Sequence, residues 1–228
     1  MRVIKSAALR RTLKIILPFL LIPSAVAAGA LLIDTDKHAF VSLAVTLLSL
    51  LFFMTGFEEK KTGTRRLVLV SVTVALSVAG RFIPFFKPIT ALTVLTGIHL
   101  GGEAGFLVGS MSAVISNFYF GQGPWTPFQM LAWGAIGLFS GFFAAPLKKS
   151  RAALLTWGVL AGAAFSFIMD IWTVLWYNEG LSLTLYLSAI ASALPHTLLY
   201  AASNIIFLAL FADTYREKIE RIKIKYGI

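Results

Sequence analysis

The chain has 228 residues, of which 58% are hydrophobic and only 13% charged, a balance far more apolar than that of an ordinary soluble domain. It contains no cysteine, which excludes a disulfide framework and a thiolate metal site. Its net charge of +10 would suggest a nucleic-acid partner in a soluble protein, but the basic residues lie between long apolar blocks, and we expect no nucleic-acid partner. The composition predicts an all-α integral membrane protein, because an apolar block of about 20 residues spans a bilayer.

Apolar blocks follow one another along the whole chain. We predict eight membrane-spanning helices, over residues 12–33, 38–57, 67–83, 88–100, 102–119, 126–145, 153–177 and 181–211. The block at 88–100 is short and could be a tilted or partial span. The first block also resembles a secretory signal, because the small residues Ala25, Val26 and Ala27 follow its apolar run, so cleavage there stays open.

Basic residues predict the orientation of these spans. Seventeen of the 20 Lys and Arg lie in four clusters, at residues 2–14, 60–66, 148–151 and 216–225. Eight crossings place all four clusters on one side, which the positive-inside rule assigns to the cytoplasm beside anionic lipid. We therefore predict a multi-pass protein of the cell membrane with both termini in the cytoplasm.

The charged stretch at 58–66 divides the chain. Residues 1–60 are predicted to be a leader of two transmembrane helices. Residues 61–215 are predicted to be a six-helix core, and residues 216–228 a basic cytoplasmic tail.

Small residues recur at every fourth position in several helices. In the core, these rows include Gly97, Gly101, Gly105 and Gly109, and also Gly137 and Gly141. Such rows let helix backbones approach closely in lipid, so we expect them to pack within one bundle. A further row, Ser71, Ala75 and Ala79, lies on the first core helix, where packing within the bundle and contact with a protein partner are both open.

Ionisable residues within spans are costly and indicate function. Arg81 and Asp170 either form a structural ion pair at the outer end of the bundle or contact a polar ligand. His196 is expected to be a bundle histidine, and the scattered histidines predict no metal site. His99 and Glu103 flank a short hairpin, where we expect them to be solvated or to face a partner.

Aromatic and amide side chains are concentrated in residues 116–134, which read SNFYFGQGPWTPFQMLAWG. An aromatic belt at the membrane interface explains some of the rings but neither the interleaved amides Asn117, Gln122 and Gln129 nor the stiff Pro124–Pro127 turn. Preorganised aromatic walls with a few polar groups are typical of ligand pockets. The stretch predicts part of a small-molecule site that faces outward.

Several motifs of the core resemble one family. They are Ala79-Gly80-Arg81, the run Lys87–Leu92, the glycine-rich run Gly101–Gly109, the stretch Ser116–Met130 and Ala132-Trp133-Gly134. Together they resemble the substrate-binding S components of energy-coupling factor (ECF) vitamin transporters, most strongly over residues 67–145. The two leading helices depart from the minimal six-helix plan of that family.

The resemblance implies an S-component-like bundle that binds a vitamin near its outer face without catalytic residues, cofactor or metal. The substrate-binding residues that it implies are Arg81, Phe85, Lys87, Asn117, Trp125, Gln129, Trp133, Asp170, Trp176 and Asn204. It also implies that Ser71, Ala75 and Ala79 contact a transmembrane scaffold subunit, which works with two ATP-binding-cassette ATPases. Because some members with a leading helix pair are associated with corrinoid supply, cobalamin is the specific ligand expected.

Other classes of function compete with this interpretation. An ion-coupled secondary transporter of a small organic solute is the main alternative, with Asp170 and His196 on a proton path, although no inverted repeat is evident. The sequence has no phosphate-binding loop, no nucleophile elbow and no zinc-protease helix, so we predict that it is not an enzyme and that ATP is hydrolysed by partners. A structural membrane scaffold would bind no ligand.

Overall fold

A computed structural model describes residues 4, 6–32, 38–56, 63–178 and 181–226, and every regular element among them is a helix. The leader consists of α1 (Ala7–Ile16), the π-helical turn η1 (Leu17–Leu21), α2 (Ile22–Leu32) and α3 (His38–Thr55). The predicted boundary at residue 60 lies outside the described residues.

Seven further helices follow the leader. They are α4 (Gly63–Gly80), α5 (Ile89–Leu100), α6 (Gly102–Phe120), α7 (Thr126–Phe142), α8 (Ala144–Lys149), α9 (Arg151–Tyr177) and α10 (Leu183–Tyr226). The described part of each predicted apolar block is helical, with three main differences. Helix α4 ends at Gly80, before the predicted end of the block at 67–83. The block at 126–145 ends early, because Pro146 has no N–H with which to continue α7, and α8 starts anew. In contrast, α10 runs past residue 215 without a break, and the pair Glu217–Arg221 at 3.9 Å supports its polar turns.

Among the residues that the structure describes, four helical segments are long and apolar enough to cross a membrane: Ala7–Leu31, α3, α9 and α10. Helix α5 is apolar but shorter. The chain is thus an all-helical, multi-pass membrane protein, while the exact number of eight crossings stays a prediction.

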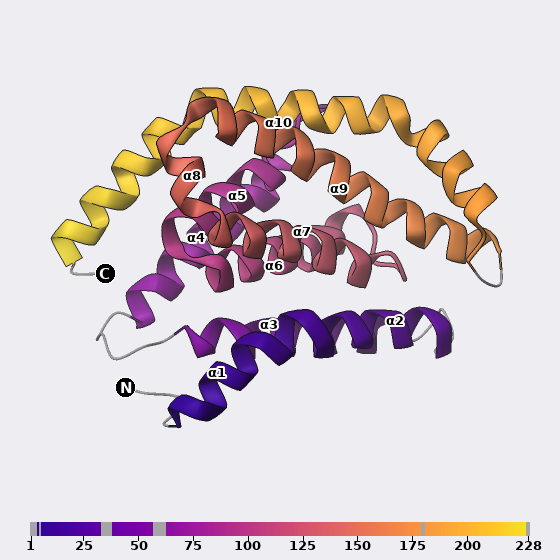
Figure 1. Cartoon of the computed structure of the whole chain (residues 1–228), viewed down its shortest axis with the longest axis horizontal. Coiled ribbons are helices and arrows are strands. Elements are labelled where there is room, and N and C mark those ends of the chain that lie inside the picture. Colours follow the sequence, from indigo (N-terminus) through magenta and orange to yellow (C-terminus); the bar gives the residue numbers. More distant parts are fainter. Residues whose placement is uncertain (1–3, 5, 33–37, 57–62, 179–180, 227–228) are drawn as a thin grey trace.

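The leader forms a layer along one face of the core, where α3 packs on α6 and α7, and α10 arches over α9 on the opposite face (Figure 1). The start of α1, helix α8 and the end of α10 lie at the left of this view, while α9 ends and α10 begins at the right. The described residues of three predicted basic clusters therefore share one end of the molecule, while the orientation in the membrane stays a prediction.

Close backbone contacts between α5, α6 and α7 explain the rows of glycine. A Cβ atom on Gly137 would lie 2.3 Å from the carbonyl oxygen of Gly105, and one on Gly97 would lie 2.2 Å from the carbonyl oxygen of Gly137. Such distances are incompatible with any side chain, so these rows pack within the bundle, as predicted.

An ion cluster joins the leader to the core. The Glu103 carboxylate on α6 lies 3.2 Å from Nζ of Lys14 on α1 and 3.5 Å from Nη2 of Arg66 on α4. The side chain of Glu103 is only 18% exposed, and His99 is buried beneath the Lys223 ammonium, which donates to its backbone carbonyl. The expectation that His99 and Glu103 are solvated or face a partner is therefore wrong, because the leader and the tail of α10 cover this end of the core.

Candidate functional site

A buried hydrogen-bond network connects three helix ends at one end of the core. Nη1 of Arg81, just after α4, donates to Oγ of Ser116 and to Oδ1 of Asn117 on α6, the latter at 2.6 Å. Nδ2 of Asn117 donates to Oγ1 of Thr126 and to Oε1 of Gln129 on α7, both at 2.8 Å. The guanidinium and the two amides thus hold one another in fixed orientations.

Glycine and proline bring these helix ends together. A Cβ on Gly80 would lie 2.2 Å from Cγ of Pro88, so the end of α4 closely approaches the start of α5 and the loop between them folds over the core. Gly121 ends α6 with a φ of 101°, and Pro127 lies in the first turn of α7. The last turn of α6 therefore faces the first turn of α7.

An aromatic stack lies behind this network. The ring of Trp133 on α7 is only 4% exposed and stacks on Phe165 of α9, with centroids 4.3 Å apart and planes 16° from parallel. Phe165 contacts Tyr200 of α10 edge to face at 5.4 Å. Nε1 of Trp133 donates to Oγ1 of Thr90 at 3.0 Å, which fixes the indole. Because a Cβ on Gly109 would lie 2.4 Å from the Trp133 backbone, close contact of α6 and α7 also fixes its position.

Two cations lie at the rim of the stack. The guanidinium carbon of Arg81 is 4.8 Å from the ring centroid of Phe120 and 5.7 Å from that of Trp133, and Nζ of Lys87 is 5.6 Å from Phe120. The backbone N–H of Lys87 donates to Oγ of Ser203 at 2.9 Å, which anchors the loop to α10. Burial, and after it the charge of Arg81, lowers the pKa of Lys87. The rim is suited to oxygen acceptors on a ligand.

We call these residues the outer cluster, because the predicted topology places them at the outer face. It consists of Arg81, Lys87, Thr90, Ser116, Asn117, Phe120, Thr126, Gln129, Trp133, Phe165, Tyr200 and Ser203. Five predicted site residues belong to it: Arg81, Lys87, Asn117, Gln129 and Trp133.

The other five predicted site residues lie outside the outer cluster, and Phe85, Trp125 and Asn204 are three of them. Phe85 is 73% exposed on the loop. The indole of Trp125 covers Gly123, because a Cβ atom on Gly123 would lie 2.3 Å from the Trp125 ring. Asn204 is buried and uses its Nδ2 to donate to the carbonyl of Gly158 at 2.9 Å, so it joins α10 to α9.

Asp170 does not pair with Arg81. It is 6% exposed, and within the described part of the chain its Oδ2 has no hydrogen-bond partner. It borders a groove between α9 and α10 together with Thr173, Ser188 and Ser192. The guanidinium of Arg81 bonds Ser116 and Asn117 instead, so the ion-pair alternative fails. His196 is exposed on α10, and the expectation that it lies within the bundle is wrong.

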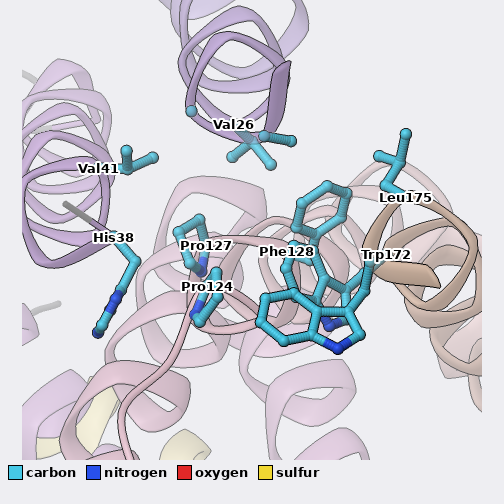
Figure 2. Close-up of a pocket in the computed structure, with 11 residues that line it drawn as sticks. Val26, His38, Val41, Pro124, Pro127, Phe128, Trp172 and Leu175 are labelled. Atoms are coloured by element: carbon cyan, nitrogen blue, oxygen red, sulfur yellow. The ribbon is translucent and has the colours of Figure 1, made fainter. Parts of the chain in front are cut away.

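The proline turn and Trp176 line a separate cavity of about 200 Å³ between the leader and the core. Figure 2 shows Val26 and Val41 of the leader on one side and Pro124, Pro127, Phe128 and Trp172 of the core on the other. The prolines thus face the leader, whereas the amides of the same stretch point into the core. Tyr119 and Tyr177 are 72% and 80% exposed, which fits an interfacial aromatic belt.

Sequence reasoning missed several members of the outer cluster, chiefly Phe120, Phe165, Tyr200 and Ser203. Phe165 carries no polar atom and lies in a long apolar helix, so nothing in its local sequence distinguishes it. Tyr200, Ser203 and Asn204 occupy one face of α10 at i, i+3 and i+4, and this polar row was a usable signal.

The predicted partner row lies on the surface. Ser71, Ala75 and Ala79 of α4 are exposed and border an open apolar groove of about 590 Å³. Its other walls come from Leu50 of α3 and from Leu107, Met111 and Ile115 of α6. Unlike the glycine rows, these small residues leave a helix face without a neighbour among the described residues.

Comparison with known protein families identifies the class of this chain. Residues 61–217 match the family described as the S component of the ECF-type riboflavin transporter, and the chain belongs to this family. No curated protein and no solved structure matched it. The match covers α4 to the polar part of α10 and leaves out the leader.

Family membership establishes the general role. S components are non-catalytic, substrate-binding subunits of vitamin transporters that act with an ECF module. The chain is therefore a transport subunit in the membrane and not an enzyme, and the ion-coupled carrier is set aside.

Proposed function

We propose that this S component binds riboflavin, or a flavin very like it, at the outer cluster and delivers it for uptake. The observation that carries the proposal is the coincidence of two facts. The family that the core matches is described as riboflavin-specific, and within that core a stacked Trp133–Phe165 pair adjoins an amide and guanidinium network.

The chemistry of riboflavin suits these groups. Its isoalloxazine is a flat, three-ring aromatic system that can stack on Trp133, Phe165 or Tyr200. Its pyrimidine edge carries carbonyl acceptors and an imide N–H, which are matched by a guanidinium donor such as Arg81 and by the oxygens of amides such as Asn117 and Gln129. Its ribityl hydroxyls would face Lys87 and Ser203 at the rim. To bind the ligand, Arg81 would have to give up part of its hydrogen bonding to Asn117 and donate to the ligand instead.

Cobalamin receives no support from the family match, which names riboflavin. The outer cluster also argues against a corrinoid, because its rings contact one another closely. A flat ligand could insert between two of these rings more readily than a bulky macrocycle could. We therefore replace the expectation of cobalamin with riboflavin.

The transport step would use the exposed row on α4. We propose that a helix of the scaffold subunit packs against Ser71, Ala75 and Ala79, since small residues permit close helix contact in lipid. Two ATPases bound to that scaffold would hydrolyse ATP. By the positive-inside rule, the end of the molecule with α8 and the end of α10 faces the cytoplasm, and the outer cluster faces outward.

Titration of the purified full chain with riboflavin tests the proposal, because flavin fluorescence is quenched when the ring stacks on tryptophan. We expect saturable quenching with riboflavin and none of comparable affinity with cobalamin, measured by calorimetry. Absence of riboflavin binding to a folded chain, or tighter binding of cobalamin, would overturn it.

A further inference from the structure

A cavity away from the outer cluster is lined by an excess of positively charged side chains. It measures about 230 Å³ and lies where the end of α5 meets α8, the start of α9 and the polar part of α10. The charged side chains that line it are Lys148, Lys149, Arg151, Asp213 and Arg216. Four cations thus surround one carboxylate.

The single carboxylate does not neutralise the cavity. Asp213 lies 3.5 Å from Nη1 of Arg151 and 3.1 Å from Nη2 of Arg216, so both of its oxygens are already engaged by arginine. Among the residues that the structure describes, Lys148 and Lys149 have no carboxylate within ion-pair distance. Two ammonium groups therefore remain available to an external anion.

The floor of the same cavity is mostly apolar. It is formed by Leu95, Ile98, Leu147, Leu154, Leu208 and Ala212, and it also includes His99. Of these, Leu208 is 1% exposed and Leu147 is 6% exposed, so they belong to the packed core. A small soluble anion gains nothing from such a floor, whereas a phospholipid presents a phosphate directly attached to an apolar body.

The position of the cavity also favours lipid. Phe142 and Phe143, next to α8, are 60% and 47% exposed, so apolar rings that can contact lipid lie beside the basic cavity. Basic pockets between helices at this level of a membrane bind acidic lipid headgroups.

We propose that this cavity binds the phosphate headgroup of an anionic phospholipid, with Lys148 and Lys149 on the phosphate and the leucine floor against the glycerol and upper acyl carbons. The bound lipid would hold α8 against α10. A free phosphate ion carries the same group as a phospholipid headgroup, so the test must distinguish between these two ligands. The proposal does not depend on the identity of the vitamin.

The test uses the purified full chain in nanodiscs of phosphatidylcholine containing a minor fraction of phosphatidylglycerol, with retained lipid counted by native mass spectrometry. We expect the wild type to retain phosphatidylglycerol. The double variant Lys148→Gln/Lys149→Gln should bind it about 30-fold more weakly, since each lysine facing anionic headgroups contributes about fivefold. Both lysines are exposed, so the variant should fold, which an unchanged size-exclusion profile and thermal midpoint in neutral detergent would verify.

The matched control is Lys218→Gln/Lys225→Gln, which removes the same charge from the same end of the molecule but outside the cavity. It should retain phosphatidylglycerol nearly as the wild type does. Equal loss in both double variants would show only general attraction to an acidic surface and would overturn the site. Inorganic phosphate, added to the chain in neutral detergent, should not raise the thermal midpoint. A rise equal to that caused by phosphatidylglycerol would overturn the lipid as the ligand.

Discussion

Asn117 on α6 donates a hydrogen bond from Nδ2 to Oε1 of Gln129 on α7 over 2.8 Å, across the turn that joins the two helices. The Oδ1 of the same amide accepts from Arg81 at 2.6 Å, so Asn117 has its donors and its acceptor engaged in one network. Both neighbours are therefore oriented by a residue that lies only 1% exposed. This arrangement makes Asn117 the central residue of the proposed vitamin site.

Replacing Asn117 by alanine should therefore weaken riboflavin binding. Arg81, Thr126 and Gln129 would lose their common partner, and each buried group left unpaired costs about 1–3 kcal/mol. We expect affinity to fall by about tenfold or more in a fluorescence titration. Asn204→Ala is the matched control, because it also removes a buried amide, but one that bonds Gly158 outside the outer cluster. Equal loss of affinity in the two variants would contradict the central role of Asn117.

Trp133→Leu tests the aromatic stack. The indole lies 4.3 Å from Phe165 and would be the surface on which an isoalloxazine stacks, an interaction worth about 0.5–1.5 kcal/mol beyond area burial. We expect weaker binding by about three- to tenfold and a loss of flavin quenching. Trp157→Leu is the control, since Trp157 is near the start of α9 and bonds Ser140, away from the cluster. Quenching that persists in Trp133→Leu would exclude stacking on this ring.

The sequence predicted the helices well, because they follow from strong physical signals. A long apolar block has few folding options in a membrane, and rows such as Gly97, Gly105 and Gly137 predict close helix packing. The amides of 116–134 were interpreted as part of a ligand pocket, and that role stays a prediction. Their hydrogen-bond partners Arg81 and Thr126 lie within the quoted motifs.

The remaining features depend on which face of a helix is covered, and one sequence does not reveal this. Asp170 and Trp176 lie on α9 as expected, but they face the α10 groove and the leader rather than the outer cluster. Glu103 seemed solvated because its partners Lys14 and Arg66 are far away in the chain. Long-range pairing between charged residues leaves no local pattern.

Ala75→Trp should separate assembly from vitamin binding. The exposed groove that Ala75 borders would be filled by an indole, so co-purification of the chain with the ECF scaffold should be lost while riboflavin affinity is retained. Val72→Trp is the matched control, because Val72 is 51% exposed on the same helix but does not line the groove. Intact complexes with Ala75→Trp would show that the scaffold docks elsewhere.

Glu103→Gln should loosen the leader from the core. Removing the carboxylate leaves Lys14 and Arg66 without their shared anion at a position only 18% exposed, and we expect a loss of about 1–3 kcal/mol, seen as a lower thermal midpoint. A double-mutant cycle with Lys14→Gln isolates the contact between α1 and α6. If the two substitutions add independently, the ion pair does not hold the leader in place.

Gly137→Ala should be among the most damaging single substitutions in the chain. Its Cβ would lie 2.3 Å from the backbone oxygen of Gly105, and neither backbone can yield without separating α6 from α7. That separation would also displace Trp133, one turn earlier on α7, so we expect poor recovery of folded protein and weak riboflavin binding in what remains. Gly158→Ala is the matched control, because its Cβ would clash with the movable Cδ1 of Leu208 at 2.6 Å and would lie at ordinary contact distance, 3.5 Å or more, from Asn204. Overpacking against a flexible side chain costs about 1–3 kcal/mol, so Gly158→Ala should still be recovered folded. Equal yields of the two variants, measured by size-exclusion chromatography, would show that α6 and α7 are not in backbone contact.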